Sequence, residues 1–377
     1  MRNIYLDYNA TTPIAPSVLE ATLPFLQEHF GNPSSSHSVG RAAVQAVRDA
    51  REKVAVAIGA EPEEIVFTSG GTESNNLALL GIFGTRTETP GHLIVSKFEH
   101  PAVCEPAAHL AHLGHSVSVI PCDVHGVVDP VDVAEAIRDD TRLVSVMHAN
   151  NEIGTLQPID EIARICRKHG VLFHTDAAQS IGKVPVRVDH APIDMMTIAG
   201  HKCYAPKGIG ALFVRHGTPL HRVTFGAGHE RGLRPGTENV PYIVALGKAC
   251  ELVANGTQEE SRRMETLRDH LQHSLLAAID GLSVNGQLAP RLPNTLSANF
   301  PRVAGHLLLS RIPQLAASTG AACHSGAAHL SNTLAAIGLS PEIANGTVRL
   351  SLGWQTSRDD VDRAAELLVG AWEQLAK

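Results

Sequence analysis

The middle of the chain alternates short apolar runs rich in β-branched residues with longer segments in which apolar residues recur at helical spacing. The short runs predict strands at residues 64–68, 92–96, 117–120, 143–147, 171–175, 195–198 and 211–215. The helical spacing predicts helices at residues 38–58, 72–83, 101–113, 131–137 and 159–169. Strands that alternate with helices are typical of parallel βα units. The pattern therefore predicts an α/β fold in which helices flank a mostly parallel central sheet.

The pattern changes from about residue 251. A charged amphipathic helix is expected to run to Ala278, followed by irregular segments, a strand at 348–352 and a closing helix at 358–375. This arrangement predicts a smaller α+β domain of residues 1–14 and 256–377, beside a large domain of residues 15–255. A chain of 377 residues is long enough to build a hydrophobic core in each domain.

Composition narrows the function classes without changing the predicted fold. With 44% hydrophobic and 18% charged residues the chain is typical of soluble globular proteins, and its net charge of −7 gives no basic surface for nucleic acid or an anionic membrane. No apolar run approaches the ~20 residues that cross a bilayer, and the first residues lack the layout of a signal peptide. We therefore expect a cytoplasmic protein that binds neither nucleic acid nor membrane.

Cysteine and histidine spacing indicates neither a disulfide framework nor a metal site. The six cysteines are scattered and include no Cys-x-x-Cys pair. None of the 21 histidines has a second histidine at the spacing of a His-x-x-x-His or His-Glu-x-x-His motif. We therefore expect no bound metal, and we expect most of the cysteines to be small buried residues.

Polar residues follow several of the predicted strands directly. The strand at 64–68 runs into a Gly70-Gly71 turn that opens a helix, so backbone N–H groups and the helix dipole would face a phosphate placed there. Three further strands end in residues 148–152, 176–179 and 199–202. The carboxyl ends of parallel strands meet at one edge of a sheet, which is where ligands bind. We therefore expect a binding site at that edge.

An acid, an amide and a lysine accompany this phosphate-type turn. Taken singly, Asp176 could cap a helix and Lys202 could be a solvated loop lysine. Taken together they match pyridoxal 5'-phosphate, whose phosphate must be fixed, whose pyridine nitrogen is kept protonated by a carboxylate and whose aldehyde is held on a lysine amine. A Rossmann-type nucleotide enzyme is the competing α/β interpretation, but no Gly-x-Gly-x-x-Gly follows an early strand and no Walker motif is present.

Short motifs run through the chain in a fixed order. They are Leu-Asp-Tyr-Asn-Ala-Thr-Thr-Pro at 6–13, Gly-Asn-Pro-Ser-Ser at 31–35, the turn at 69–76, Glu99-His100, Asn-Asn-Glu at 150–152, Asp-Ala-Ala-Gln at 176–179, Gly-His-Lys at 200–202, Glu230-Arg231, Arg-Pro-Gly-Thr at 234–237 and Thr-Gly-Ala-Ala-Cys at 319–323. With these motifs the chain resembles, nearly end to end, the cysteine desulfurase and selenocysteine lyase family, which consists of class-V aminotransferase-like, fold-type I pyridoxal-phosphate enzymes. The resemblance implies that fold and a homodimer.

The resemblance also implies roles toward the cofactor. Lys202 resembles the lysine that holds it, Asp176 the partner of its pyridine nitrogen and Gln179 the donor to its ring hydroxyl. The other contacts implied in this way are His100 stacked on the ring, Gly71, Thr72 and His201 at the phosphate, Asn151, and Thr237 from the second subunit. Relatives often carry serine where this chain has Ala199, which puts one phosphate contact in question.

On the substrate side, the resemblance implies contacts from Asn9, Asn32, Asn151 and Arg349. An arginine suits a substrate carboxylate because its planar fork meets the two oxygens in parallel hydrogen bonds. A purely structural role for Asn151 and Arg349 is the alternative.

Cys323 lies among small residues at 317–328, a stretch with little to bury. Without the resemblance, a small buried cysteine on a tight loop is the ordinary interpretation. The resemblance makes the Cys323 thiolate the nucleophile that attacks the substrate sulfur and becomes a persulfide, with Lys202 as the base at Cα and His100 as a third catalytic residue. It thus implies a pyridoxal-phosphate-dependent cysteine desulfurase that converts L-cysteine to L-alanine.

Motifs in the chain point in both directions on whether the substrate carries sulfur or selenium. The segments around Cys323 and at residues 8–13 resemble selenocysteine lyases, whereas Pro101 after His100 resembles bacterial cysteine desulfurases. The resemblance favours L-cysteine, with L-selenocysteine as the alternative and activity on both expected, and an aminotransferase of the same fold as a third interpretation. An iron–sulfur scaffold, a tRNA-thiolation relay and a selenophosphate synthetase all fit as the acceptor protein for persulfide or selenium.

Overall fold

The structure is a computed structural model that describes residues 3–84, 89–319, 321–322 and 329–377. Its largest sheet has the strand order β2-β8-β7-β6-β5-β3-β4. The bounds of these strands are β2 (Ile65–Thr68), β3 (His92–Ser96), β4 (Ser116–Ile120), β5 (Thr141–Ser145), β6 (Leu172–Asp176), β7 (Met195–Ala199) and β8 (Gly210–Val214). The strands from β7 to β4 run parallel, and β8 is antiparallel to both of its neighbours.

The strand directions follow from the connections. From β3 to β6 the chain crosses over through α4 (Pro101–His112), α5 (Pro130–Ala136) and α6 (Ile159–Lys168), and helical crossovers join parallel strands. Residues 200–209, between β7 and β8, hold only the short 3-10 helix Gly200–Lys202, so the chain turns back and β8 pairs antiparallel. The prediction of an α/β fold with a mostly parallel sheet is confirmed.

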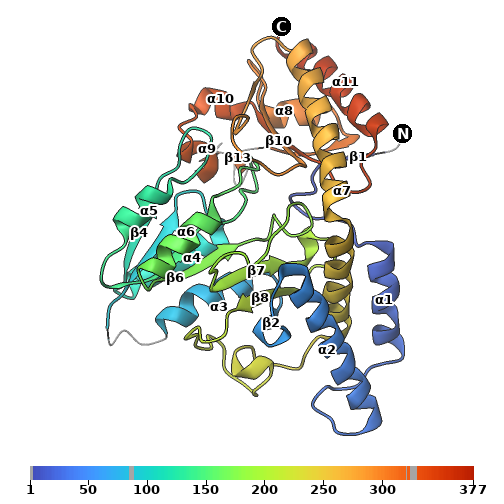
Figure 1. The fold of residues 1–377 in the computed structure, drawn as a ribbon. Coiled ribbons are helices and arrows are strands. Elements are labelled where there is room, and N and C mark those ends of the chain that lie inside the picture. The colour runs from blue at the N-terminus through green and yellow to red at the C-terminus, as the bar shows by residue number, and fades with distance from the viewer. Residues whose placement is uncertain (1–2, 85–88, 320, 323–328) are drawn as a thin grey trace.

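Helices cover both faces of this sheet (Figure 1). α3 (Gly71–Phe83) and α4 pack on one face, and α2 (Ser38–Ile58), α6 and α7 (Val240–Ala278) share the core of the other face. Successive strand residues point to opposite faces, so Leu93 and Val95 of β3 belong to one core and Ile94 to the other. α1 (Pro16–Gln27) packs against α7.

A second, smaller sheet lies at the other end of the molecule (Figure 1). Its order is β12-β15-β10-β9, with bounds β9 (Ser283–Val284), β10 (Thr295–Asn299), β12 (Ser318–Thr319) and β15 (Thr347–Ser351). Leu271, Leu350 and Leu368 are fully buried in its core, which includes α11 (Arg358–Leu375) and takes Ile4 and Leu6 from the N-terminal segment. We propose that this core marks the smaller of the two expected domains.

The remaining elements are short. They are β1 (Ile4–Tyr5), the 3-10 helices Pro62–Glu64 and Glu230–Gly232, α8 (Gly305–Ser310), β11 (Leu315–Ala316), β13 (Ala321–Ala322), β14 (His329–Leu330), α9 (Asn332–Ala336) and α10 (Pro341–Asn345).

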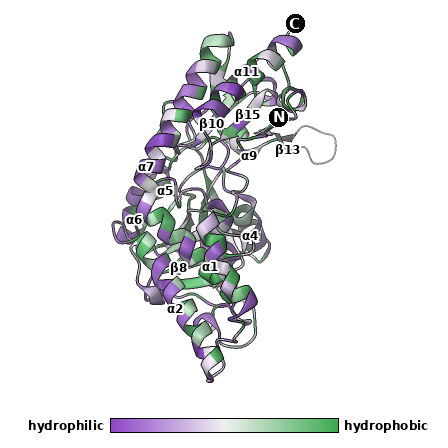
Figure 2. Ribbon diagram, turned by 90° about the vertical axis from the view of Figure 1, so that its right-hand side faces the viewer, coloured by the Kyte–Doolittle hydropathy of each residue, from purple (hydrophilic) through white to green (hydrophobic). Residues whose placement is uncertain are grey.

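The 39-residue helix α7 connects the two cores. Leu246 and Val253 lie in the large core, and Leu267 and Leu275 lie in the small one. Hydrophilic and hydrophobic stretches alternate along the helix, as its exposed and buried sides require (Figure 2). The helix begins at Val240 rather than near residue 251, so the predicted start was wrong. Residues 240–250 are all buried or half-buried, and such a segment lacks the polar positions that reveal a helical period.

A buried carboxylate ties the segment before α7 to the sheet. Glu230 accepts two hydrogen bonds from Arg51, at 2.6 and 2.9 Å, and a third at 2.8 Å from the backbone N–H of Phe67 in β2. Its side chain is only 3% exposed, so water cannot replace these bonds. The ion pair therefore fixes the position of residues 230–232 relative to β2.

Glu230→Ala is expected to lower the free energy of unfolding by about 3–5 kcal/mol, because it leaves the Arg51 guanidinium half-buried and unpaired. Urea unfolding of the variant beside wild type measures the change. Glu366→Ala on the exposed side of α11 is the matched control, expected to change stability by less than about 0.5 kcal/mol. Equal stability of the two variants would show that the buried pair contributes nothing.

Candidate active site

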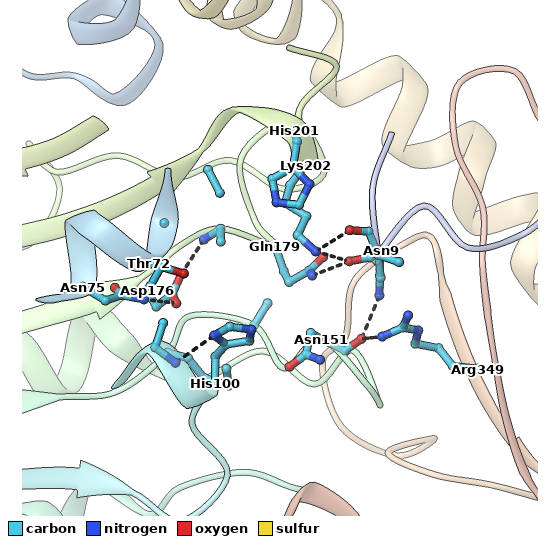
Figure 3. Close-up of a pocket in the computed structure, with 17 residues that line it drawn as sticks. Asn9, Thr72, Asn75, His100, Asn151, Asp176, Gln179, His201, Lys202 and Arg349 are labelled. Carbon is cyan, nitrogen blue, oxygen red and sulfur yellow. Dashed lines mark hydrogen bonds between the residues drawn. The ribbon is translucent and has the colours of Figure 1, made fainter. Parts of the chain in front are cut away.

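A pocket opens at the carboxyl ends of β6 and β7, where α3 and α4 begin (Figure 3). The N-terminal segment and β15, which belong to the second core, form its opposite wall. Ten residues that the sequence singled out line this pocket: Asn9, Gly71, Thr72, His100, Asn151, Asp176, Gln179, His201, Lys202 and Arg349. Residues separated by up to 340 positions in the chain are thus brought together.

Three other residues singled out in the sequence are not among those that line the pocket. Asn32 is exposed in the loop between α1 and α2, where its Oδ1 accepts the N–H of Ser34 at 2.9 Å. Thr237 is exposed in the segment before α7. Cys323 lies outside the described residues. The roles expected of these three residues stay predictions.

One end of the pocket is formed by the turn from β2 into α3. Gly70 has φ 149°, a conformation that favours glycine, and α3 starts without a side-chain cap. A Cβ on Gly71 would lie 3.3 Å from the Cβ of Ala199, so the small residues at both positions keep this end open. Uncapped N–H groups at a helix start are suited to bind a phosphate.

His201 also lines the pocket. Burial, and next the neighbouring Lys202 amine, lower the pKa of His201 to about 4, so its imidazole is uncharged at neutral pH. Its Nδ1 lies 3.2 Å from the hydroxyl of Thr11. An uncharged imidazole still has one N–H to donate.

Asp176 ends β6 inside the pocket and is 6% exposed. Its Oδ2 accepts from the side chain of Asn75 at 2.7 Å, and its Oδ1 accepts from the backbone N–H of Ala178 at 2.9 Å. Both donors are neutral, and Asp176 forms no ion pair with any residue that the structure describes. A buried carboxylate without a cation is costly, which leaves this site suited to a cationic ligand atom.

His100 caps the start of α4 on the other side of the pocket. Its Nδ1 accepts the backbone N–H of Ala102 at 3.0 Å, which assigns the ring proton to Nε2. Burial is the main cause that lowers the pKa of His100, and Asp176 opposes it only in part. The ring is therefore an uncharged, flat surface held in one orientation (Figure 3).

Lys202 reaches across the pocket toward the N-terminal segment. Its Nζ donates to the backbone oxygen of Asn9 at 2.5 Å and to that of Ala10 at 2.9 Å. Burial, followed by the positive charge of Arg349, lowers the pKa of Lys202 to about 8. A substantial fraction of the amine is therefore unprotonated near neutral pH, as a nucleophile or general base requires.

The lowered pKa of Lys202 predicts how its reactivity depends on pH. Only the unprotonated amine attacks an aldehyde, so labelling of Lys202 by a small aldehyde in the apo-protein is expected to fall about tenfold per pH unit below pH 8 and to level off above it. Exposed lysines have a pKa near ~10.4 and should keep gaining reactivity up to that pH. Reductive trapping followed by peptide mass spectrometry resolves the sites. A Lys202 curve that follows the exposed lysines would contradict this account.

Arg349 on β15 faces the pocket from the side of the second core. It donates to the backbone oxygen of Asn151 at 2.9 Å and pairs with the Asp7 carboxylate at 2.8 Å. Ser318 of β12 donates to the same Asp7 oxygen at 2.9 Å. The guanidinium is therefore oriented by partners from two segments, and Ser318 holds one of those partners in place. Its remaining N–H groups are available for a carboxylate.

Two side chains at the site were missed in the sequence. Asn75 lies one turn into α3 and orients Asp176, and Lys183 contacts Asn9 and Gln179 from behind the pocket. The spacing of Asn75 four residues after Gly71 is a signal that could have placed it near the turn. Nothing in the sequence distinguishes Lys183 from an exposed lysine.

These residues fit the pyridoxal phosphate that the resemblance implies. The uncapped start of α3 suits its phosphate, the unpaired Asp176 carboxylate suits its protonated ring nitrogen, and the Lys202 amine suits its aldehyde. The residues present therefore provide for all three requirements of this cofactor.

No helix in the described part of the chain is long and apolar enough to cross a membrane. Within the same residues, no group of three or more His, Cys, Asp or Glu side chains is placed to hold a metal ion. Cys104, Cys122, Cys166, Cys203 and Cys250 are free thiols.

The pattern of the family described as aminotransferase class-V matches residues 4–364. The chain is 44% identical over 376 residues to the cysteine desulfurase IscS of Dictyoglomus turgidum, covering 99% of this chain and 95% of the relative. It is 45% identical over 367 residues to the cysteine desulfurase IscS of Methanosarcina thermophila, covering 97% and 91%.

Solved structures agree with these relatives. A NifS-like protein with 36% identity superposes with a TM-score of 0.92 and covers 99% of both chains. SspA in complex with cysteine has 38% identity and a TM-score of 0.82, and the match covers 92% of this chain and 98% of that one. The chain therefore belongs to the class-V aminotransferase family, in its cysteine desulfurase branch.

Proposed function

We propose that the protein is a pyridoxal-phosphate-dependent cysteine desulfurase, which converts L-cysteine to L-alanine and transfers the sulfur to Cys323 as a persulfide. The observation that carries this proposal is the meeting of a buried, unpaired Asp176 carboxylate and the Lys202 amine in one pocket. The cysteine desulfurases among the relatives, and the cysteine-bound neighbour, support cysteine as the substrate.

The cofactor, when bound, supplies an electron sink for the negative charge that develops at the substrate Cα. The chain's part is to hold it in place. In this proposal Asp176 keeps the ring nitrogen protonated, Gln179 donates to the ring hydroxyl and the His100 ring packs on its face. The N–H groups of Gly71 and Thr72, with His201, hold the phosphate.

Lys202 has a second task as the base that removes the proton from the substrate Cα. Its amine suits this because burial has lowered its pKa to about 8, close to working pH. The backbone oxygens of Asn9 and Ala10 orient the amine. Arg349 and Asn151, on the other wall, hold the substrate carboxylate so that the Cα–H bond points toward Lys202.

Cys323 receives the sulfur in the proposed reaction. Its thiolate attacks the sulfur of the bound cysteine, an S–S bond forms and the Cβ–S bond breaks. The electron pair of the broken bond stays with Cβ, which takes up a proton. The protonated Lys202 amine returns a proton to Cα, and the product leaves as alanine. The persulfide on Cys323 then passes to an acceptor protein.

The proposed active unit is a homodimer in which Thr237 of each chain reaches the phosphate of the other. Thr237 and Phe225 are exposed on the single chain, and Phe225 is 70% exposed. The resemblance implies this dimer, and the exposed position of Thr237 leaves it accessible to a second chain. Sedimentation is expected to give a dimer, and a fully active monomer with full cofactor occupancy would contradict this part of the proposal.

The product distinguishes this function from its alternatives. Incubation with L-cysteine and a reductant is expected to give alanine and sulfide in equal amounts. A keto acid together with pyridoxamine phosphate would instead identify an aminotransferase. Turnover on L-selenocysteine, measured in parallel, decides the preferred element: a preference of several orders of magnitude for selenocysteine would make the protein a selenocysteine lyase.

A further inference from the structure

Lys183 lies directly behind the pocket without lining it. It follows β6 in a turn, and the residue is 5% exposed. Its Nζ donates to Oε1 of Gln179 at 2.7 Å and to Oδ1 of Asn9 at 3.2 Å. Ser261 of α7 donates to its backbone oxygen, so its main chain is also fixed. A long, polar side chain has thus been buried with its amine aimed at two residues of the site.

The partners of Lys183 are unusual for a buried lysine. Among the residues that the structure describes it has no carboxylate partner, and both of its acceptors are neutral amide oxygens. Burial lowers the pKa of Lys183 well below its ordinary value, and the positive charges of Lys202 and Arg349 lower it further. Its two hydrogen bonds give one acceptor to each of two N–H donors.

This contact, together with the one from Gln179 to the backbone oxygen of Asn9, decides which way round the Gln179 amide lies. An amide group presents an oxygen on one side and an NH2 group on the other. Because Lys183 donates to Gln179, the amide oxygen must face Lys183 and the NH2 group must face the pocket. That NH2 group donates to the backbone oxygen of Asn9 at 2.9 Å and lies in the pocket wall (Figure 3).

Lys183 fixes the side chain of Asn9 in the same manner. Asn9 Oδ1 accepts from Lys183 and from Asn294 at 3.1 Å. Its NH2 group therefore points the other way, toward the backbone oxygen of Asn151 at 3.2 Å and the hydroxyl of Thr295 at 2.8 Å. One buried amine thus contributes to the orientation of two amides at the site.

We propose that Lys183 is a positioning residue that fixes Gln179 so that its NH2 group, and not its oxygen, faces the cofactor ring hydroxyl. This inference rests on the proposed function, which places pyridoxal phosphate in the pocket. Without Lys183 only the bond to the backbone oxygen of Asn9 still orients the Gln179 amide. An amide that turns its oxygen toward the ring hydroxyl would accept from that hydroxyl and favour its protonated form. A lysine that only filled space would have no such effect on the ligand.

A double-mutant cycle tests whether Lys183 acts through Gln179. The variants are Lys183→Met, Gln179→Ala and the two combined, with Lys168→Met at the exposed end of α6 as the matched control. The dissociation constant of pyridoxal phosphate is measured on each apo-protein. Each single variant is expected to bind about tenfold more weakly than wild type, and the double variant also only about tenfold more weakly. The control should bind like wild type.

The visible absorption spectrum of the bound cofactor is a second readout. A hydrogen bond to the ring hydroxyl favours its deprotonated form. Lys183→Met and Gln179→Ala are therefore expected to shift the spectrum alike, toward the form with a protonated hydroxyl. Lys183→Gln, which keeps an N–H donor at this position, is expected to restore the wild-type spectrum and to bind within about threefold of wild type.

Several outcomes would overturn the inference. One is a loss of affinity for pyridoxal phosphate of about a hundredfold in the double variant, because independent effects multiply. Another is a Lys183→Met variant whose affinity and spectrum are those of wild type. Apo-protein unfolding is followed for every variant. If Lys183→Met does not fold, Lys183→Gln decides: a tenfold loss of affinity despite the retained donor would refute the role. A wild-type protein that binds no pyridoxal phosphate would overturn the proposed function as well, whereas the other outcomes concern Lys183 alone.

Discussion

Replacing Lys202 by alanine is expected to lower the rate of alanine release from L-cysteine by about 10³-fold or more, because the variant loses its base at Cα. The same change removes the covalent attachment of the cofactor, so borohydride treatment should no longer fix it to the protein. The fold should persist, because among the described residues Lys202 bonds only to two backbone oxygens, and it lies outside both cores.

Lys207→Ala provides the matched control for this variant. Lys207 is exposed and lies five residues further along the same connection between β7 and β8. Its replacement is expected to leave turnover and borohydride fixation unchanged. Wild-type turnover in Lys202→Ala would remove this residue from the mechanism, and loss of both activities in Lys207→Ala would point to general damage of the loop.

Asp176→Asn is expected to lower turnover by about 10²-fold or more, since a neutral amide no longer stabilises the proton on the ring nitrogen. The substitution also replaces one acceptor oxygen by an NH2 group, which then faces a hydrogen-bond donor. Oδ1 and Oδ2 of Asp176 both accept hydrogen bonds, so one of the donors from Asn75 and Ala178 must lose its acceptor. Cofactor binding should weaken less than turnover, because the phosphate and Lys202 contacts remain.

Cofactor occupancy and turnover, measured on the same samples, separate these two effects. Asp280→Asn, in an exposed position after α7, serves as the control and should match wild type in both. If Asp176→Asn turned over cysteine at the wild-type rate, another residue would have to serve the pyridine nitrogen.

The helices and strands with clear local signals could be predicted from the sequence. The helix at 38–58 has its predicted bounds, since it is amphipathic and ends at Gly59 in the left-handed conformation. The closing helix at 358–375 starts from a Ser357–Asp360 capping box and also has its predicted bounds. Strand β5 lies two residues earlier than the predicted strand at 143–147.

Elements without such signals were not predicted. α1 contains Pro24, has no side-chain cap and leaves Leu19 and Leu23 exposed, so neither its composition nor its spacing indicated a helix. β10 forms only because β15 and β9 pair with it on either side, which is a tertiary effect. Its position in the small sheet also places Thr295 against Asn9.

The part of the candidate site that lies at the ends of neighbouring strands could be predicted from the sequence, because these ends meet at one edge of the sheet. Asp176 is the last residue of β6, and Lys202 comes three residues after the end of β7, the parallel neighbour of β6. The strand order alone therefore brings the two residues to one pocket. Lys183 could not be predicted, because its burial and its contact with Asn9 depend on the N-terminal segment crossing from the second core. The contact implied between Thr237 and the site of a second subunit likewise cannot be predicted from patterns within one chain.

The central claim, that Cys323 takes sulfur from cysteine, is tested most directly by locating the sulfur after a single turnover. Wild-type protein is mixed with one equivalent of L-cysteine, alkylated and analysed by peptide mass spectrometry, with alanine measured in the same sample. The account predicts one additional sulfur atom on the peptide containing Cys323 for each alanine released, and no alanine from Cys323→Ala, while Cys122→Ala behaves like wild type. Alanine released at the wild-type rate by Cys323→Ala, with no added sulfur on Cys323 in the wild type, would contradict it.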